Sequence, residues 1–272
     1  MKILIVNSIG IQVVSSIRSL TALGHEVSIA IPTNGIIKRK RLKEFFYPKG
    51  LCNIYYISNP NDKTNFDLEL IELLKENDFD TVLPFGFETT VAISSIKDQV
   101  LNYTNTSVAD YDLIQKVHDK EVLNKLLNDN GFVVPRIFDY RDLNELKNAH
   151  INYPVVVKAR KGCGIDKGVR YANNDKELEE SYLEISENKS DNIELSDYSK
   201  PMVQEYVPGK IYDGCFVCNN GDIVASLLQV RDVTYPLSGG VGANIITIQD
   251  QELLKYCTDI LKFLKWHMLL GF

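Results

Sequence analysis

The first 110 residues alternate between short apolar runs and longer segments with helical periodicity. Strands are predicted at the apolar runs 3–6, 27–31, 53–57 and 81–84, and helices at the periodic segments 9–23, 67–77 and 88–96. Continuous apolar strands with helices between them are typical of a parallel sheet that is covered on both faces. We therefore expect residues 1–111 to form a doubly wound, Rossmann-like α/β domain.

Two turns of this domain, 7–10 and 84–88, are candidates for contact with a substrate. Each follows a predicted strand, and doubly wound sheets often bind ligands at the carboxyl edge of their strands. The pattern G-x-G-x-x-G is absent after the first strand, so the sequence does not support a dinucleotide site.

The pattern changes after residue 111. Helices are predicted at 113–117, 120–127, 142–148 and 175–185, and strands at 154–158, 168–172 and 202–206. A glycine-rich turn separates the first two of these strands. The polar segment 186–200 is typical of an excursion on the surface.

The last sixty residues predict a hairpin followed by a helix. Strands at 214–218 and 223–230 flank Asn219-Asn220-Gly221-Asp222, which is a strong hairpin turn. A flexible loop is expected at 238–244. The later apolar residues at helical spacing are Leu253, Cys257, Ile260, Leu264 and Met268. We expect this helix to run into the apolar end 266–272.

Composition excludes several classes of protein. The formal net charge of -6 and the pI near 5.3 argue against nucleic-acid binding, which needs a concentrated positive face. The basic cluster at 38–43 is interpreted as a solvated segment without a role. No run approaches the roughly 20 apolar residues of a membrane span, and the start does not resemble a signal peptide. We expect a cytoplasmic protein that binds no membrane.

The cysteines and histidines do not indicate a metal or catalytic centre. The five cysteines are odd in number and scattered, which favours reduced, buried structural thiols over disulfides: Cys52, Cys163, Cys215, Cys218 and Cys257. The C-x-x-C pair at 215–218 lies in a predicted strand, and no second pair or histidine cluster completes a zinc site. None of the four histidines belongs to a recognisable trio of nucleophile, base and orienting group.

The strongest candidate chemistry is phosphate binding around Lys158, which ends a buried strand. A charged lysine there is costly unless an anion or a carboxylate compensates it. The following turn, 159–169, is rich in glycine, whose backbone N–H groups can approach phosphate oxygens closely. No G-K-[ST] opens a helix, so this is not a Walker loop. Taken alone, Lys158 could equally be a lysine that reaches solvent at a strand end. Taken alone, the glycine-rich turn could equally be an ordinary hairpin.

Flanking motifs make the phosphate interpretation stronger than either feature alone. Residues 117–120 precede a helix, residues 131–135 read G-F-V-V-P, and residues 204–209 read Q-E-Y-V-P-G at the end of a predicted strand. A strand that runs into a connector between two lobes can offer a nucleobase its backbone N–H and C=O groups while apolar side chains cover the ring.

In this order, D-K before a helix, G-F-x-V-P, Y-P-V-V-V-K, the glycine-rich loop and Q-E-Y-V-P-G resemble the ATP-grasp superfamily, over about residues 1–250. The sequence is most similar to branches like the carbamoyl-phosphate synthase large chain. The resemblance implies an N-terminal pre-ATP-grasp domain at 1–111 and an α+β ATP-grasp domain. Its first lobe would occupy 112–200 and its second, incomplete lobe 201–272.

The resemblance also implies roles for particular residues. Lys120 and Lys158 would contact the phosphates of ATP, and the loop containing Gly162, Gly164 and Gly168 would fold over them. The adenine connector would be Glu205, Tyr206 and Val207. Val156 and Met202 would be apolar neighbours of the ring, although core packing explains them equally well.

Two positions concern substrate contacts beyond the phosphates. Relatives usually read G-x-E after the connector, with a glutamate that holds the ribose hydroxyls, and Ile211 stands there in this chain. Asp213 is the candidate to replace that glutamate. Arg231 is a candidate to hold a substrate carboxylate or phosphate. A surface ion pair between Arg231 and Asp232 is the open alternative.

The activity implied is that of an ATP-dependent ligase with Mg2+ as cofactor and a carboxylate and an amine as small-molecule substrates. In the family, metal ligands follow the helix that begins near Glu252, and this sequence ends at Phe272 before any E-x-N-x-R pattern. We therefore expect a truncated chain that binds ATP but is impaired in catalysis. A nucleotide-binding module without turnover, and a subunit completed by a partner chain, are the alternatives. A homodimer is compatible with the sequence.

Overall fold

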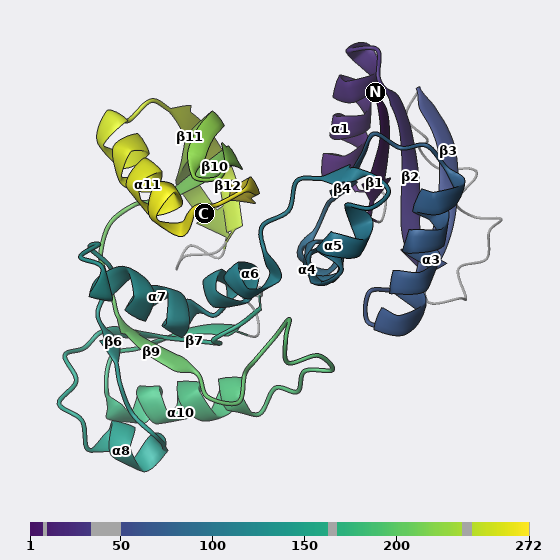
Figure 1. Ribbon diagram of the computed structural model, residues 1–272. Helices are drawn as coiled ribbons and strands as arrows, with labels where there is room; N and C mark the ends of the chain where they lie inside the picture. Colours follow the sequence, from purple (N-terminus) through teal and green to yellow (C-terminus); the bar gives the residue numbers. More distant parts are fainter. Residues whose placement is uncertain (8–9, 34–49, 163–167, 236–240, 272) are drawn as a thin grey trace. The chain divides into compact units, whose positions relative to one another are not determined.

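The structure is a computed structural model that describes residues 1–7, 10–33, 50–162, 168–235 and 241–271. Its internal contacts divide the chain into two units, Met1–Tyr111 and Asp112–Phe272 (Figure 1). The basic cluster 38–43, Cys163, Gly164 and part of the predicted loop 238–244 lie outside the described residues.

Unit 1 is built on a five-stranded sheet with the strand order β3-β2-β1-β4-β5. All of its strand pairs are parallel. The strands are β1 (Lys2–Val6), β2 (Glu26–Thr33), β3 (Leu51–Ser58), β4 (Thr81–Pro84) and β5 (Asn105–Thr106). The doubly wound parallel sheet predicted from the apolar runs is confirmed.

Helices cover both faces of this sheet. They are α1 (Ile11–Ala22), α3 (Lys63–Glu76), α4 (Phe87–Ser95) and α5 (Lys97–Val100). Successive side chains of a strand point to opposite faces, so Ile5 packs with Val13 and Ile17 of α1, while Leu4 joins the core of α3 and α4. This is why each strand needs a continuous apolar run rather than an alternating one.

Helix α3 begins four residues before the predicted helix at 67–77. Asp62 precedes it as the N-cap, and its carboxylate accepts hydrogen bonds from the backbone N–H and the side-chain amide of Asn65. A capped polar first turn carries no apolar periodicity, which is why the hydrophobic pattern missed it.

Unit 2 contains two antiparallel sheets. The first has the order β6-β9-β7-β8 and consists of β6 (Ile137–Phe138), β7 (Val155–Lys158), β8 (Val169–Ala172) and β9 (Met202–Glu205). Its helices are α6 (Tyr111–His118), α7 (Lys120–Asp129), α8 (Leu143–Lys147) and α10 (Asp175–Ser186). Val155 and Val157 of β7 pack with Ile185 of α10 in one core.

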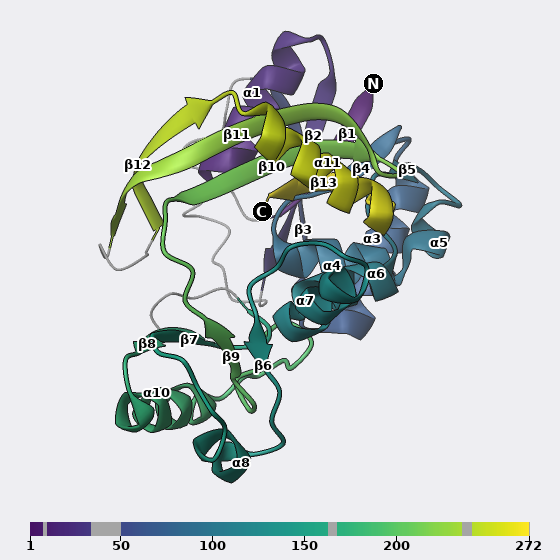
Figure 2. The same ribbon diagram turned by 90° about the vertical axis from the view of Figure 1, so that its left-hand side faces the viewer.

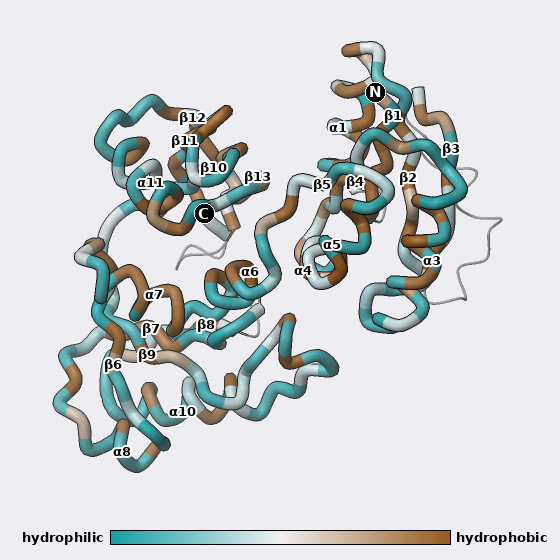
Figure 3. The backbone as a smooth tube through the Cα atoms, viewed as in Figure 1, coloured by the Kyte–Doolittle hydropathy of each residue, from teal (hydrophilic) through white to brown (hydrophobic). Residues whose placement is uncertain are grey.

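The polar segment 186–200 joins α10 to β9 without a helix or strand of its own and is mostly hydrophilic (Figure 3). An isolated bridge pairs Asp197 with Lys161. The excursion is therefore attached to the end of the β7 hairpin rather than projecting freely.

The second sheet of unit 2 has the order β12-β11-β10-β13, and α11 lies across it (Figure 2). The elements are β10 (Ile211–Asn219), β11 (Asp222–Tyr235), β12 (Val241–Ile248), α11 (Gln251–Leu264) and β13 (Met268–Gly271). The predicted hairpin forms between β10 and β11, with φ values of 50° at Asn220 and 93° at Gly221. The N–H of Gly221 donates to the carbonyl of Trp266 at 2.7 Å, which ties the turn to the end of α11.

Two predictions in this region and one on the cysteines are wrong. Met268 does not continue the helix, because Lys265 adopts a left-handed conformation and the chain returns as β13, which pairs with β10. Residues 241–244 belong to β12 and not to a loop. Cys52 is an exposed thiol rather than a buried one, although Cys218 is buried as expected. The described cysteines are free thiols.

Among the described residues, no helix combines the length and the apolar character needed to cross a membrane.

The two faces of β10 predict very different costs of substitution at adjacent residues. Phe216 is completely buried and Val217 is 40% exposed. We expect Phe216→Ala to lower the free energy of unfolding by about 3–5 kcal/mol, whereas Val217→Ala changes it by less than about 0.5 kcal/mol. Urea titration followed by the fluorescence of Trp266, the single tryptophan, measures both. Equal effects at the two positions would contradict the assignment of faces.

Candidate functional site

A cavity of about 470 Å³ lies in unit 2, between residues of both of its sheets. The first sheet contributes β7, β8 and β9, the second contributes β10 and β11, and the connector after β9 completes the wall. The lining residues are Pro135, Val156, Lys158, Tyr171, Gln204, Glu205, Tyr206, Val207, Gly209, Lys210, Ile211, Arg231, Asp232 and Thr234.

Lys158 is the central cation of this cavity. Side-chain alternation along β7 directs Val156 and Lys158 to the face opposite the α10 core, toward the cavity. The Lys158 ammonium donates to Oε1 of Gln204 at 2.7 Å. Within the described residues it has no carboxylate partner. Burial, and secondly the charge of Lys120, hold the pKa of Lys158 below its ordinary value.

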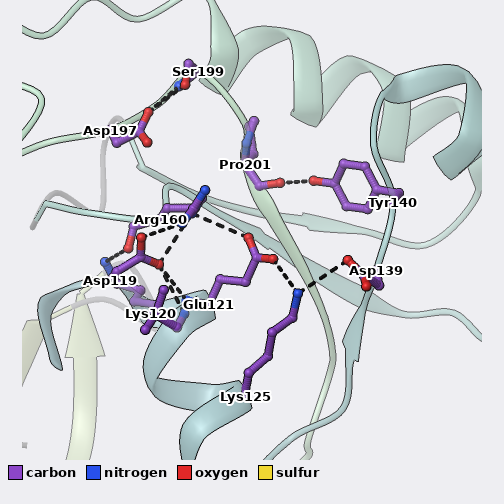
Figure 4. Close-up of polar contacts among 11 residues, drawn as sticks. Asp119, Lys120, Glu121, Lys125, Asp139, Tyr140, Arg160, Asp197, Ser199 and Pro201 are labelled. Carbon is purple, nitrogen blue, oxygen red and sulfur yellow. Dashed lines mark hydrogen bonds and ion pairs between the residues drawn. The ribbon is translucent and has the colours of Figure 1, made fainter. Parts of the chain in front are cut away.

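Lys120 is a second cation near Lys158. It is the first residue of α7, whose N-cap Asp119 accepts hydrogen bonds from the next two backbone N–H groups, those of Glu121 and Val122. Its ammonium donates to the carbonyl of Gly162 at 2.9 Å. Its backbone N–H donates to the carbonyl of Arg160 at 3.0 Å (Figure 4). The start of α7 is therefore joined to the end of β7, and the charge of Lys120 acts on Lys158.

The ends of the glycine-rich loop flank the same strand. Gly162 has φ of 97°, and a Cβ there would lie 2.9 Å from Oγ of Ser196. Its conformation favours glycine, and a Cβ at this position would require the Ser196 side chain to move. The carbonyl of Gly168 accepts from the N–H of Ala159 at 2.8 Å. Gly164 lies outside the described residues, so the predicted closure of this loop stays a prediction.

The connector 205–207 follows β9 along the cavity wall. The Glu205 carboxylate accepts from the backbone N–H of Arg136 at 2.8 Å, and the N–H of Tyr206 donates to the carbonyl of Pro154 at 3.3 Å. These bonds fix the connector against both neighbouring segments. Val207 lines the cavity and is 60% exposed.

Tyr171 is a cavity residue that the sequence analysis did not select. It lies opposite Val156 in the β7–β8 ladder and therefore shares its face. Its ring is 6.0 Å from that of Tyr206, edge to face, and burial together with Tyr206 raises its pKa. The signal was present in the alternation of β8, where Ala172 belongs to the core and its neighbour must face the other way.

Arg231 and Asp213 are paired with each other. Nε and Nη2 of Arg231 donate to the two carboxylate oxygens of Asp213, each at 2.7 Å. From the sequence, Asp213 was a candidate for a ribose contact, and Arg231 was a candidate for a substrate anion or for an ion pair with Asp232. Both lie on the same face of neighbouring strands, where Arg231 lines the cavity and Asp213 anchors its guanidinium.

Other candidate residues lie outside this cluster. Met202 is buried opposite Lys158 in the β7–β9 ladder but does not line the cavity, unlike Val156. His118 binds the carbonyl of Leu195 through Nε2 at 2.8 Å, and burial is the main cause of its lowered pKa. In the part of the chain that the structure describes, no group of three or more histidine, cysteine, aspartate or glutamate residues could hold a metal ion.

Similar solved structures identify the fold. A biotin carboxylase from Campylobacter jejuni, in complex with a βγ-ATP compound, superposes with a TM-score of 0.74 and 13% identity over 99% of this chain. An L-amino acid ligase from Bacillus licheniformis gives 0.67 and 14% over 98%. N5-carboxyaminoimidazole ribonucleotide synthetase from Thermotoga maritima gives 0.60 and 17% over 99%. The fold is that of ATP-grasp enzymes.

The chain spans 61–63% of the length of these three ATP-grasp structures. No protein-family model and no curated protein matches the sequence. At 13–17% identity the comparisons establish the ATP-grasp fold, and the roles of the cavity residues rest on the geometry described above.

The environment of Lys158 predicts that this residue lowers stability. Because the folded state lowers its pKa, the folded state binds that proton less tightly than the unfolded chain, whose lysine has the ordinary value of 10.5. The charged Lys158 therefore lowers the free energy of unfolding at every pH below its pKa in the folded state. This destabilisation disappears as the pH rises from that lowered pKa toward 10.5. We expect Lys158→Met to gain about 1 kcal/mol at neutral pH, and the gain to shrink at pH 10.

Urea titrations at both pH values measure this difference. Lys147→Met, at an exposed lysine that pairs with Glu179, is the matched control and should change little at either pH. A Lys158→Met variant that is clearly less stable than the wild type at neutral pH would show that the lysine serves the fold.

Proposed function

We propose that this chain binds ATP in the cavity of unit 2 and belongs to an ATP-dependent ligase that activates a carboxylate for attack by an amine. The observation that carries the proposal is the Lys158 ammonium, which faces the cavity beside Lys120 and donates a hydrogen bond to the neutral amide of Gln204. An ammonium that is partly removed from water is stabilised by an anion, and a polyphosphate supplies several negative oxygens.

The cavity supports a definite orientation of the nucleotide. Lys120, Lys158 and the loop between Gly162 and Gly168 would receive the phosphates. The base would lie along the connector Glu205-Tyr206-Val207, against Val156 and the ring of Tyr171. Aromatic and apolar walls with few polar groups are typical of sites that hold a planar base.

The proposed reaction has two steps. A carboxylate oxygen of the first substrate attacks the γ-phosphorus of ATP, so that an acylphosphate and ADP form. The amine then attacks the acyl carbon, loses a proton and expels inorganic phosphate, which leaves an amide. Lys120 and Lys158 would stabilise the charge on the transferring phosphoryl group. Arg231, oriented by Asp213, would hold the acceptor carboxylate.

Use of Mg2+ belongs to this proposal because one similar structure, a biotin carboxylase domain, is a complex with MgADP. The names of the similar proteins are ligase, carboxylase and synthetase, which favours an enzyme over a binding module without turnover. The kinship with carbamoyl-phosphate synthase, a homodimer and a cytoplasmic location stay predictions.

Calorimetric titration with Mg-ATP tests nucleotide binding directly, with ADP as a comparison. We expect the wild-type chain to bind, and Lys158→Ala to lose at least about tenfold in affinity because a charge-assisted contact to phosphate is removed. Lys147→Ala, at an exposed lysine remote from the lining residues, is the control. Unchanged affinity in Lys158→Ala would contradict the proposed phosphate site.

Tyr171 provides a separate test of the base end. We expect Tyr171→Ala to weaken ATP binding by about threefold to tenfold while leaving the affinity for inorganic tripolyphosphate unchanged, because the ring contacts only the base. Tyr171→Phe keeps the ring and should retain most of the affinity. Parallel titrations with both ligands check this, and an equal loss for both would place Tyr171 outside the base site.

A further inference from the structure

Arg160 joins the end of β7 to the start of α7 through two acidic residues (Figure 4). Its Nη2 lies 2.5 Å from Oδ2 of Asp119, and its Nε lies 3.3 Å from Oδ1 of Asp119 and 3.4 Å from Oε2 of Glu121. The Arg160 side chain is 26% exposed and that of Asp119 is 7% exposed. Such a shielded two-pronged contact holds its partners more firmly than an exposed ion pair does.

The same residue holds α7 through its backbone. The carbonyl of Arg160 accepts from the N–H of Lys120 at 3.0 Å. Asp119 meanwhile accepts from the N–H groups of Glu121 and Val122, so one carboxylate both caps α7 and receives the guanidinium. The first turn of the helix is thus fixed to β7 from both sides of Lys120.

Lys120 lies between Asp119 and Glu121 in the sequence, and its side chain does not follow theirs toward the Arg160 guanidinium. Asp119 and Glu121 turn toward Arg160, whereas the Lys120 ammonium reaches the carbonyl of Gly162. Its charge is one of the two causes that lower the pKa of Lys158. The separation of the two lysines therefore depends on where the start of α7 lies relative to β7.

We propose that Arg160 is a positioning residue that fixes α7 against β7, so that Lys120 and Lys158 act as one site for the polyphosphate of a nucleotide. The inference rests on the proposed function for the identity of the ligand and adds the element that assembles the site. Arg160 lies beyond the lining residues of the cavity, and its effect on the ligand passes through Lys120. Arginine is suited to this task because its planar fork can bind two carboxylates at once, which an ammonium cannot do in the same geometry.

Three ligands separate the phosphate end from the base end: ATP, inorganic tripolyphosphate and adenosine. We expect Arg160→Met to lose about tenfold in affinity for ATP and tripolyphosphate, and to bind adenosine as the wild type does. Asp119→Asn should show the same selectivity, because asparagine preserves the N-cap of α7 while the charge pair is lost. Arg160→Lys should recover little.

Arg170→Met is the matched control. Arg170 also binds a carboxylate with two prongs, with Nε 2.9 Å and Nη2 2.5 Å from the oxygens of Glu184. It lies on β8, where it faces the α10 side of the sheet instead of the cavity. Its removal should affect stability like that of Arg160 but leave all three affinities unchanged.

The pKa of Lys158, measured by NMR of its side chain in the protein without nucleotide, gives a readout that a purely structural role would not change. If Arg160 holds Lys120 near Lys158, Arg160→Met and Asp119→Asn should raise the pKa of Lys158 toward 10.5. Arg170→Met should leave it where it is in the wild type.

The outcomes distinguish the two proposals. Selective loss of phosphate affinity together with a raised pKa of Lys158 supports the role of Arg160. Equal losses for adenosine and tripolyphosphate, or unchanged affinities with an unchanged pKa, overturn it. If the wild type binds neither ATP nor tripolyphosphate, the proposed function fails, and the pKa of Lys158 in Arg160→Met still decides whether Arg160 positions Lys120.

Discussion

The ammonium of Lys158 bound to the amide of Gln204 is the interaction around which the candidate site is organised. A carboxylate in place of the amide would neutralise the lysine and remove its attraction for an anion. An amide satisfies one of the three N–H donors without supplying charge. The cavity therefore keeps a net positive end, and the second lysine, the ends of the glycine-rich loop and Arg160 are all arranged near that end of β7.

The other end of the cavity has a different character. Tyr171, Tyr206 and Val207 present rings and methyl groups, and the connector is fixed by backbone hydrogen bonds on either side of them. The second sheet adds a guanidinium whose direction is set by Asp213. A cationic end, an aromatic end and an oriented arginine can accommodate a molecule that is itself divided into anionic and planar parts, as a nucleotide is.

Much of the fold could be predicted from the sequence because its elements are locally encoded. The apolar runs of the parallel sheet and the hairpin turn at 219–222 depend on neighbouring residues alone, and the structure confirms them. The end of the chain was mispredicted because Met268 fits a helical spacing, while the left-handed Lys265 that ends the helix has no sequence signal of the usual glycine kind. Pairing with β10, a contact distant in sequence, decides that Met268 lies in a strand.

Part of the cavity lining could be selected from the sequence. Lys158 and the connector were selected because their motifs are contiguous, and both line one cavity. The sequence did not reveal three features that join different strands or helices. They are Tyr171 beside Tyr206, the Asp213–Arg231 pair and the contact of Arg160 with Asp119. Such pairs depend on strand register and helix placement, which a single sequence encodes only through long-range packing.

The turn between β10 and β11 limits which substitutions this sequence can accept during evolution. At Gly221 a Cβ would lie 2.8 Å from Cα of Lys262 and 3.0 Å from the carbonyl oxygen of Leu261, both backbone atoms that cannot rotate away. Its φ of 93° also disfavours any other residue, and its N–H is engaged by Trp266. Steric contact with α11, a positive φ and a backbone hydrogen bond thus all constrain Gly221. Descendants of this protein can vary the flanking residues of the turn, but an exchange at Gly221 requires helix α11 to move with it.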